Sequence, residues 1–382
     1  MSKKRFAAHL LLEDGSEFSG WSFGKARSAA GEVVFTTGMT GYPQALTDPS
    51  FRGQILVTTY PLAGNYGVPL AAKTMRPYFD RYGIPVHFES ERIQAAGFVV
   101  SENCEEPSHF SCGATLSGWL ENDGVPAISG VDTRSLTKRL REQGVMRGRI
   151  IVDGQAEVSL DSGDIHNPVA EVSCDTVKVY TPHDAPPGVE GARLKIVLID
   201  CGAKANILRC LLSRGVEVIR VPWNYDLRGL EYDGLFLSNG PGDPKACGKT
   251  IASLRRAFSV GKPIFGICLG NQLMALAAGG DTYKLPYGHR AQNQPCADVG
   301  TRRCYITSQN HGYAVRGESL PLGWEPWFVN VNDGTIEGIR STDGLFSAVQ
   351  FHPEGCPGPR DTEFLLDRFL ADSRAQRLNA KR

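Results

Sequence analysis

One short segment constrains the fold of this chain more than any other. It reads Phe265-Gly-Ile-Cys268-Leu-Gly270-Asn-Gln, an apolar run that meets a cysteine between two glycines and continues as a second apolar run. The first run has the composition of a buried strand and the second, over 273–278, that of a helix, so the chain must turn sharply at Cys268. Such a turn crowds its neighbours, and glycine at positions 266 and 270 relieves the crowding.

This strand-turn-helix is the nucleophile-elbow arrangement with sulfur in place of oxygen. It would expose the Cys268 thiol at the end of the strand, over the amino end of the following helix. The positive end of a helix dipole stabilises a thiolate, which is the reactive form of cysteine. The alternative is a buried cysteine beside two packing glycines, the usual environment of cytosolic thiols, and we assign the other cysteines of the ten to it.

Around this segment, apolar strands alternate with helices. Strands are predicted at 195–200, 216–221, 234–238, 263–267 and 346–351, and helices at 205–214, 254–260 and 361–374. Continuous apolar strands of this kind are buried on both faces. The pattern therefore predicts an α/β fold with a doubly wound, mostly parallel sheet.

The rest of the chain predicts a second domain, since 382 residues exceed one ordinary core. Residues 1–152 show short apolar runs, among them 31–36, 55–59 and 97–101, with a helix at about 135–144, which indicates a mixed α/β domain of unreadable topology. Residues 153–192 are rich in Asp, Gly, Ser and then Pro, as in a connector. The predicted division is 1–152, a connector at 153–192, and 193–382.

Composition excludes several classes of protein. Lys plus Arg and Asp plus Glu both number 41, so nothing favours nucleic acid or anionic membrane as a partner. No cysteine lies in a C-x-x-C pair, and no stretch approaches the roughly 20 apolar residues of a membrane span. The apolar run 6–12 stops at two acidic residues and is interpreted as a first strand rather than a leader. A cytoplasmic location is expected.

A second candidate site segment is His352-Pro-Glu354, which follows the last predicted strand. Open α/β sheets form their ligand-binding and active sites at the carboxyl ends of the strands, where this segment lies. Glu354 could accept a hydrogen bond from one imidazole nitrogen and leave the other to act as base for the thiol. A lone His-Pro-Glu is more often a strand-ending turn, but an elbow in the same domain favours the catalytic interpretation.

The loop Ser238-Asn-Gly240-Pro-Gly242-Asp-Pro244 follows another strand, and its N–H groups could face an oxyanion. The N–H of Leu269 is the natural second donor. A phosphate loop is the competing interpretation, because Gly-Lys-Thr follows at 248–250. That pattern requires four residues between its glycines, whereas five separate Gly242 from Gly248 here, so we reject it.

Together, Gly240-Pro-Gly242, the Cys268 segment and His352-Pro-Glu354 resemble the class I glutamine amidotransferases over about 193–375. Further motifs resemble carbamoyl-phosphate synthase small chains, and the likeness then spans nearly the whole chain. These motifs are Gly31-Glu-Val-Val-Phe, Met39-Thr-Gly-Tyr, Leu46-Thr-Asp-Pro-Ser50, Val131-Asp-Thr-Arg134, Tyr287-Gly-His289 and Ser308-Gln-Asn310-His311-Gly312-Tyr313.

The resemblance implies a glutaminase that uses Cys268 as nucleophile, His352 as base and Glu354 as orienter. It implies that glutamine is held by Ser50, Gly240, Gly242, Leu269, Gln272, Asn310, Gly312 and Tyr313. Ser50 is equally well explained as a turn serine. One departure is Asn271, where many relatives carry histidine.

The resemblance also implies a partner. Ammonia would pass to a large synthetase subunit that makes carbamoyl phosphate from bicarbonate, with ATP and a divalent cation bound there, while no cofactor or metal is expected in this chain. A heterodimer, or a higher oligomer, would follow. Three alternatives remain: the glutaminase of another amidotransferase, a cysteine hydrolase of related fold, and a non-enzymatic subunit.

Overall fold

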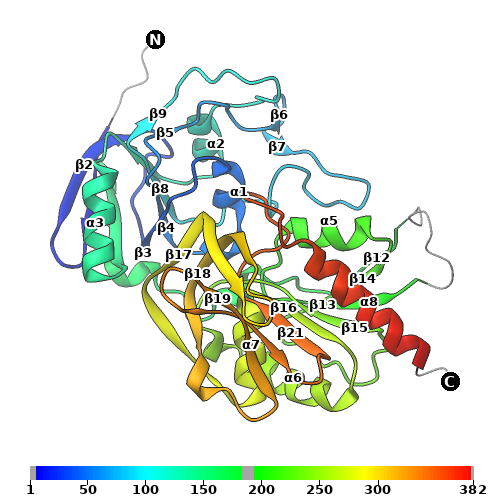
Figure 1. The fold of residues 1–382 in the computed structure, drawn as a ribbon. Coiled ribbons are helices and arrows are strands. Elements are labelled where there is room, and N and C mark those ends of the chain that lie inside the picture. The colour runs from blue at the N-terminus through cyan, green and yellow to red at the C-terminus, as the bar shows by residue number, and fades with distance from the viewer. Residues whose placement is uncertain (1–5, 183–192, 380–382) are drawn as a thin grey trace. The chain divides into compact units, whose positions relative to one another are not determined.

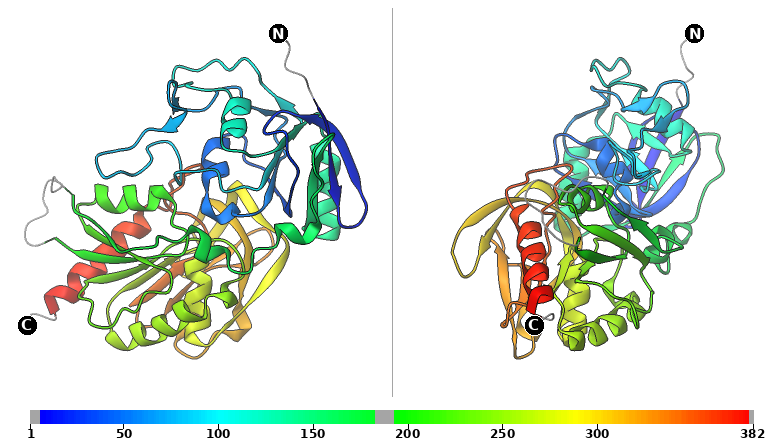
Figure 2. Two further views of the ribbon diagram at one scale, coloured as in Figure 1. Left: turned by 180° about the vertical axis from the view of Figure 1, so that it is seen from behind. Right: turned by 90° about the vertical axis from the view of Figure 1, so that its right-hand side faces the viewer.

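The computed structural model describes residues 6–182 and 193–379 of the chain (Figures 1 and 2). The chain divides into two compact units, Met1–His166 and Asn167–Arg382. Among the described residues, no helix is both long enough and apolar enough to cross a membrane.

The first unit is built on a closed barrel whose strands follow the order β1-β11-β3-β4-β8-β10-β2. Burial alternates strictly along β1 and β11, so one face of each strand packs into the barrel. Parallel pairs join β3 to β4 and β8 to both β4 and β10, and the remaining pairs are antiparallel. The barrel strands are β1 (Ala7–Leu12), β2 (Glu17–Ser22), β3 (Ala29–Thr36), β4 (Ile55–Thr58), β8 (Gly97–Val99), β10 (Ala127–Ser129) and β11 (Met146–Val152).

Short helices accompany the barrel. The longest, α3, covers Thr133–Gln143 and confirms the helix predicted there. It begins where the Asp132 side chain accepts a hydrogen bond from the Ser135 N–H at 2.9 Å, and it ends at Gly144, whose φ is 91°. The other elements of this unit are α1 (Tyr42–Thr47), η1 (Pro49–Phe51), α2 (Leu116–Asn122), η2 (Leu160–Gly163), β5 (Leu62–Ala63), β6 (Leu70–Ala71), β7 (Arg76–Pro77) and β9 (Glu102–Asn103).

The second unit contains a ten-stranded sheet in the order β12-β14-β13-β15-β16-β21-β20-β18-β17-β19. The run from β14 to β21 is parallel, and its strands are those predicted from their apolar composition. Their bounds are β13 (Lys195–Asp200), β14 (Glu217–Pro222), β15 (Gly234–Leu237), β16 (Ile264–Ile267) and β21 (Phe346–Val349).

Helices cover both faces of the parallel strands (Figure 2). Leu235 and Leu237 pack with α6 and α7, whereas Phe236 between them makes an edge-to-face contact with Phe369 of α8. This alternation is what a doubly wound sheet requires, and it confirms the predicted fold class. The helices are α5 (Ala205–Ser213), α6 (Gly248–Val260), α7 (Leu269–Ala278) and α8 (Phe364–Asn379).

The antiparallel part of this sheet was not predicted. Its two longest strands, β17 (Asp281–Asp298) and β18 (Cys304–Arg316), contain prolines, glycines and polar residues. The β17–β18 pairing also shifts register between Lys284 and His289 and again between Ala291 and Gln294. Such interruptions break the period of two on which strand prediction depends. The other antiparallel strands are β12 (Lys178–Tyr180), β19 (Trp324–Asn330) and β20 (Ile336–Ser341).

The predicted connector at 153–192 holds several short elements, and its last part, 183–192, lies outside the described residues. The boundary between the two units falls within it, after His166. Beyond η2 it includes α4 (Pro168–Val172), and β12 pairs antiparallel with β14. The remaining short helices of the second unit are η3 (Pro244–Ala246) and η4 (Gly317–Ser319).

A buried ion pair lies at the carboxyl end of β13, between Asp200 and Arg220 of β14. Asp200 is fully buried, and its Oδ2 accepts hydrogen bonds from the Arg220 guanidinium at 2.6 and 2.8 Å. The same carboxylate accepts the N–H groups of Cys174, Gly202 and Ala203 at 2.7 to 2.9 Å. The pair therefore holds together β13, β14 and the turn that leads into α5.

Replacing Arg220 with methionine should destabilise the second unit by about 3 to 5 kcal/mol, because it leaves a buried carboxylate without a counter-charge. Chemical denaturation followed by circular dichroism measures this as a lower transition midpoint. Arg228→Met is the matched control, since Arg228 pairs with Asp226 at an exposed site and should change stability by less than about 1 kcal/mol. Equal midpoints for the two variants would contradict the role given to the Asp200–Arg220 ion pair in holding these elements together.

Candidate active site

Cys268 lies at the turn from β16 into α7, with φ 55° and ψ −102°. Positive φ is unusual for any residue with a side chain, so the strain of the turn is concentrated at this one position. The N–H groups of Asn271 and Gln272 donate to the Cys268 carbonyl at 3.1 and 3.3 Å, which means that the helix begins directly after the cysteine. The predicted strand-turn-helix is confirmed.

Gly266 and Gly270 permit this turn because the backbone approaches them too closely for a side chain. Neither glycine needs an unusual dihedral angle. A Cβ on Gly266 would lie 2.8 Å from backbone atoms of Gly270. A Cβ on Gly270 would lie 2.7 Å from the carbonyl oxygen of Leu237 on β15. Any larger side chain at either position would push α7 away from the sheet and move the thiol.

The Cys268 thiol is buried, and the expectation that it is exposed is wrong. Only 2% of the residue is exposed, and Sγ lies 3.6 Å from the carbonyl oxygen of Asn310. Asn310 belongs to β18, one of the antiparallel strands that the sequence did not reveal. The strand that covers the thiol could therefore not be anticipated.

His352 and Glu354 follow the end of β21 and form a buried hydrogen-bonded pair. Nδ1 of His352 lies 2.7 Å from Oε1 of Glu354, and their side chains are 2% and 0% exposed. Nε2 makes no hydrogen bond among the described residues. The Cys268 thiol is close enough to contribute to raising the pKa of the imidazole. The structure thus brings the three predicted catalytic residues together.

Lys204 joins this group and was missed in the sequence. It follows β13, and its Nζ lies 3.1 Å from Glu354 Oε1 and donates to the Gly355 carbonyl at 2.7 Å. Its side chain is only 3% exposed. The available signal was its position: a charged residue just after a buried parallel strand, at the edge where the histidine was expected.

These charges set the protonation of the pair. Burial alone would lower the pKa of His352, but the Glu354 carboxylate outweighs burial and raises the pKa above its usual range. Burial alone would also raise the pKa of Glu354, and the Lys204 ammonium, with His352, lowers it instead. An imidazolium beside a carboxylate is therefore favoured at neutral pH.

The loop after β15 has the tight conformation expected of an oxyanion site. Gly242 has φ 85°, and a Cβ on Gly240 would collide with the carbonyl oxygen of Cys201. Leu269 is the first residue of α7, so its N–H has no acceptor within the helix. The rejected phosphate site is unsuitable in the structure too, because the Thr250 hydroxyl donates to the Trp223 carbonyl at 2.6 Å.

Comparisons with known proteins identify a matching family for each of two stretches of the chain. Residues 10–150 match the family described as "Carbamoyl-phosphate synthase small chain, CPSase domain", and residues 197–371 match "Glutamine amidotransferase class-I". The chain belongs to the carbamoyl-phosphate synthase small-chain family.

Three relatives illustrate this membership. The multifunctional protein pyr-3 of Neurospora crassa is 49% identical over 94% of this chain, and the multifunctional protein CAD of Squalus acanthias is 48% identical over 97%. The human mitochondrial carbamoyl-phosphate synthase [ammonia] is 44% identical over 97%. This chain spans only 21%, 16% and 24% of those three proteins. A solved structure of a glutamine amidotransferase from Thermotoga maritima aligns with TM-score 0.38 and 16% identity, over 49% of this chain and 86% of that one.

Most residues that the family resemblance assigns to glutamine lie on elements around Cys268. Gln272 on α7 donates to the Tyr313 carbonyl on β18 at 2.8 Å, which links two of the predicted binding residues. Its amide also donates to Gln350 Oε1 at 3.2 Å. Leu269 and Gln272 lie on α7, and Asn310, Gly312 and Tyr313 lie on β18. Gly240 and Gly242 lie in the loop after β15.

Ser50 belongs to the first unit, where its N–H donates to Asp48 Oδ1 at 2.9 Å in the first turn of η1, and its assignment to glutamine stays a prediction. Asn271 is fully buried and donates to Gln350 Oε1 at 3.2 Å. The departure from the family at position 271 therefore affects a buried hydrogen bond beside α7.

Replacing Glu354 with glutamine should lower the pKa of His352, because the carboxylate that stabilises the imidazolium is removed. Lys204→Met should raise the same pKa, since a neighbouring cation is lost. Nitrogen-15 NMR of the histidine ring measures both changes. A wild-type His352 that is neutral at pH 7 would contradict this description.

The pKa shifts of His352 and Glu354 also determine how the stability of the fold changes with pH. The raised pKa of His352 contributes stability that is complete below its unfolded pKa and is lost as pH rises through the folded value. The lowered pKa of Glu354 contributes stability that is complete above its unfolded pKa and is lost as pH falls through the folded value.

Proposed function

We propose that this chain hydrolyses the side-chain amide of L-glutamine and supplies the ammonia for carbamoyl phosphate synthesis. The observation that carries the proposal is the buried arrangement of Cys268, His352 and Glu354 at the carboxyl edge of one parallel sheet. Family membership supports the substrate class.

Family membership alone does not specify the nitrogen source. A relative whose name specifies ammonia is 44% identical over 97% of this chain. An enzyme that takes ammonia directly needs no nucleophile, whereas glutamine hydrolysis needs a thiolate, a proton donor and a water-activating base. This chain carries Cys268 for the first role and His352 for the other two, and Glu354 lies 2.7 Å from the imidazole that it orients.

The proposed reaction has two steps. The Cys268 thiolate attacks the amide carbon, and the N–H groups near Gly240 and Leu269 stabilise the oxyanion. His352 protonates the departing nitrogen, which leaves as ammonia and yields a glutamyl thioester. The now neutral His352 takes a proton from water, the hydroxide cleaves the thioester, and glutamate departs with the thiolate restored.

Two other functions fit parts of the chain. The glutaminase of a different amidotransferase would share the second unit but not the match over residues 10–150. A cysteine hydrolase of related fold would share Cys268 and His352. Hydrolysis of glutamine compared with that of a peptide panel distinguishes this last alternative.

Replacing Cys268 with serine should reduce glutamine hydrolysis by about 10³-fold or more, because a serine hydroxyl is a far poorer nucleophile beside this base. Glutamate release measures the loss. Cys247→Ser is the matched control, since Cys247 is also fully buried and burial raises the pKa of its thiol to about 12. Substantial glutaminase activity in Cys268→Ser would overturn the proposed function.

We also propose that a synthetase polypeptide or fused domain consumes the ammonia. The curated relatives are several times longer than this chain, which supports such a partner. Ammonia is largely protonated at neutral pH and ammonium is not a nucleophile, so transfer within a complex has a chemical purpose. ATP and a divalent cation are assigned to that partner.

The chain alone should release glutamate from glutamine but make no carbamoyl phosphate from glutamine, bicarbonate and ATP. Adding the synthetase polypeptide should produce carbamoyl phosphate and increase the glutaminase rate. A coupled assay with and without the partner measures both. Carbamoyl phosphate made by the purified chain alone would contradict the partner proposal and leave the glutaminase proposal intact.

A further inference from the structure

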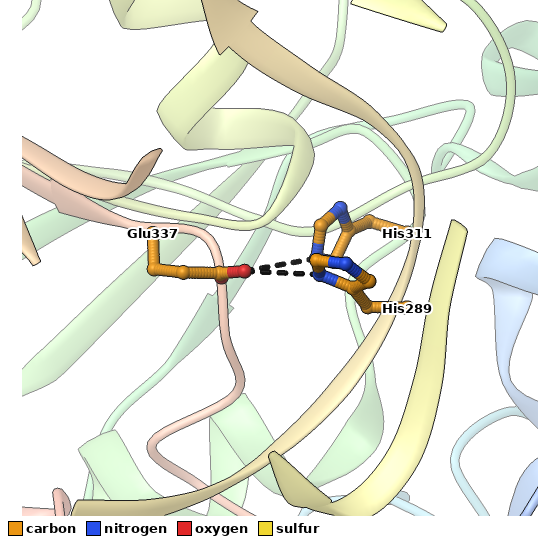
Figure 3. A group of neighbouring side chains, drawn as sticks. All are labelled: His289, His311 and Glu337. Carbon is orange, nitrogen blue, oxygen red and sulfur yellow. Dashed lines mark hydrogen bonds and ion pairs between the residues drawn. The ribbon is translucent and has the colours of Figure 1, made fainter. Parts of the chain in front are cut away.

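One group of side chains outside the triad has the composition of a metal site. Among the residues that the structure describes, His289, His311 and Glu337 bring one ligand atom each to within 4.8 Å of one another. They come from β17, β18 and β20, and Figure 3 shows the carboxylate directed at both rings. All three residues are buried.

The distances suit a single small cation. Nδ1 of His289 lies 3.1 Å and Nε2 of His311 lies 3.8 Å from the same Glu337 oxygen, Oε1. Ligands about 2.0–2.2 Å from a tetrahedral zinc ion are roughly 3.3–3.5 Å apart. The two rings are nearly perpendicular, at 82°, with centroids 5.0 Å apart, so they are not stacked against one another.

Each imidazole has an outer partner for its other nitrogen. Nε2 of His289 lies 2.9 Å from Asp333 Oδ2, the carboxylate–histidine arrangement that orients metal-binding histidines. Nδ1 of His311 lies 2.9 Å from the Tyr313 carbonyl, which can only accept, so a proton on this nitrogen leaves a lone pair on Nε2. That lone pair faces Gln309 Oε1 at 3.2 Å as well as Glu337, and a cation between these oxygens and the ring would relieve the repulsion. Both rings are thus oriented with one nitrogen toward Glu337.

The carboxylate has an unused oxygen. Oε2 of Glu337 is buried and makes no hydrogen bond among the described residues. A buried carboxylate oxygen without a partner costs free energy, and a bound cation would remove that cost. This observation is independent of the spacing of the three ligands and concerns the same carboxylate.

We propose that His289, His311 and Glu337 bind a divalent transition-metal ion of the zinc class. Two imidazoles and one carboxylate suit zinc or cobalt, whereas magnesium and calcium require oxygen ligands throughout. Three protein ligands leave one position for water. This proposal departs from the expectation of no metal in this chain, which rested on local motifs, whereas these ligands come from three strands.

The site would act on the reaction centre indirectly. His311 and Gln272 share the Tyr313 carbonyl as acceptor, and the neighbouring Asn310 carbonyl lies against the Cys268 thiol. An ion that fixes the His311 ring would also fix this segment of β18. The metal ligands are positioning residues in this respect and contact no reacting atom.

A proton on His289 is the competing occupant. A doubly protonated ring would bridge Asp333 and Glu337 without any metal, and Asn330 Nδ2 already donates to Glu337 Oε1 at 3.3 Å. The two occupants predict different behaviour toward added cations, so a binding experiment distinguishes them.

The test is titration of the full chain with Co²⁺ after treatment with a chelator. We expect a single equivalent to produce visible d–d absorption without a thiolate charge-transfer band, and to raise the melting temperature. Zn²⁺ should displace the cobalt spectrum. His289→Ala should abolish binding, and Asp333→Asn, which removes no ligand, should weaken it by about 10- to 100-fold.

His9→Ala is the matched control. His9 also lies between two carboxylates, Glu17 at 2.7 Å and Asp153 at 3.5 Å, but it is partly exposed and has no second histidine in its group. The cobalt spectrum should be unchanged in this variant and also in Cys268→Ser, which separates the site from the nucleophile. Circular dichroism verifies that every variant is folded.

Three results would overturn the proposal: no saturable cobalt spectrum in the wild type, a spectrum that persists in folded His289→Ala, or one lost in Cys268→Ser. None of these depends on glutamine hydrolysis. The metal site and the proposed function can therefore fail separately.

Discussion

The close approach of β15, β16 and α7 around Cys268 is the constraint on which the rest of the site depends. Because α7 begins directly after the cysteine, the thiol can occupy only the carboxyl edge of the sheet. Its partners must then come from neighbouring strand ends. β21 pairs with β16 in register, with Ile267 opposite Val349, and this places His352 three residues beyond a paired position. The same edge receives Lys204 from β13 and Gly240 from β15.

Three buried charged side chains contact one another in series beside the nucleophile. Glu354 lies between Lys204 and His352. Buried ion pairs add little net stability, since desolvation offsets most of the attraction. What these three side chains add is control of protonation: the cation keeps the carboxylate ionised, and the carboxylate keeps the imidazole charged. The arrangement therefore serves the chemistry of the site more than the stability of the fold.

The sequence predicted what depends on local pattern. Continuous apolar strands identified the parallel sheet, and glycine spacing identified the turn at Cys268, because both reflect interactions between near neighbours in the chain. Features built from distant segments were not predictable. The burial of the thiol depends on β18, whose register is interrupted, and the Lys204–Glu354 contact joins residues 150 positions apart. The barrel of the first unit depends on closure between strands whose composition gives no pairing order.

Whole-chain similarity and site geometry answer different questions here. Identity of 44–49% is a value for nearly the whole chain and does not single out the positions that react. A relative named for ammonia is 44% identical to this chain, so the percentage of identity does not distinguish the nitrogen source. In the proposed function, that distinction rests on three side chains, which are held by the elbow and by the end of β21. The geometry around Cys268 is therefore stronger support for glutamine hydrolysis than any percentage of identity, because it concerns the atoms that the reaction requires.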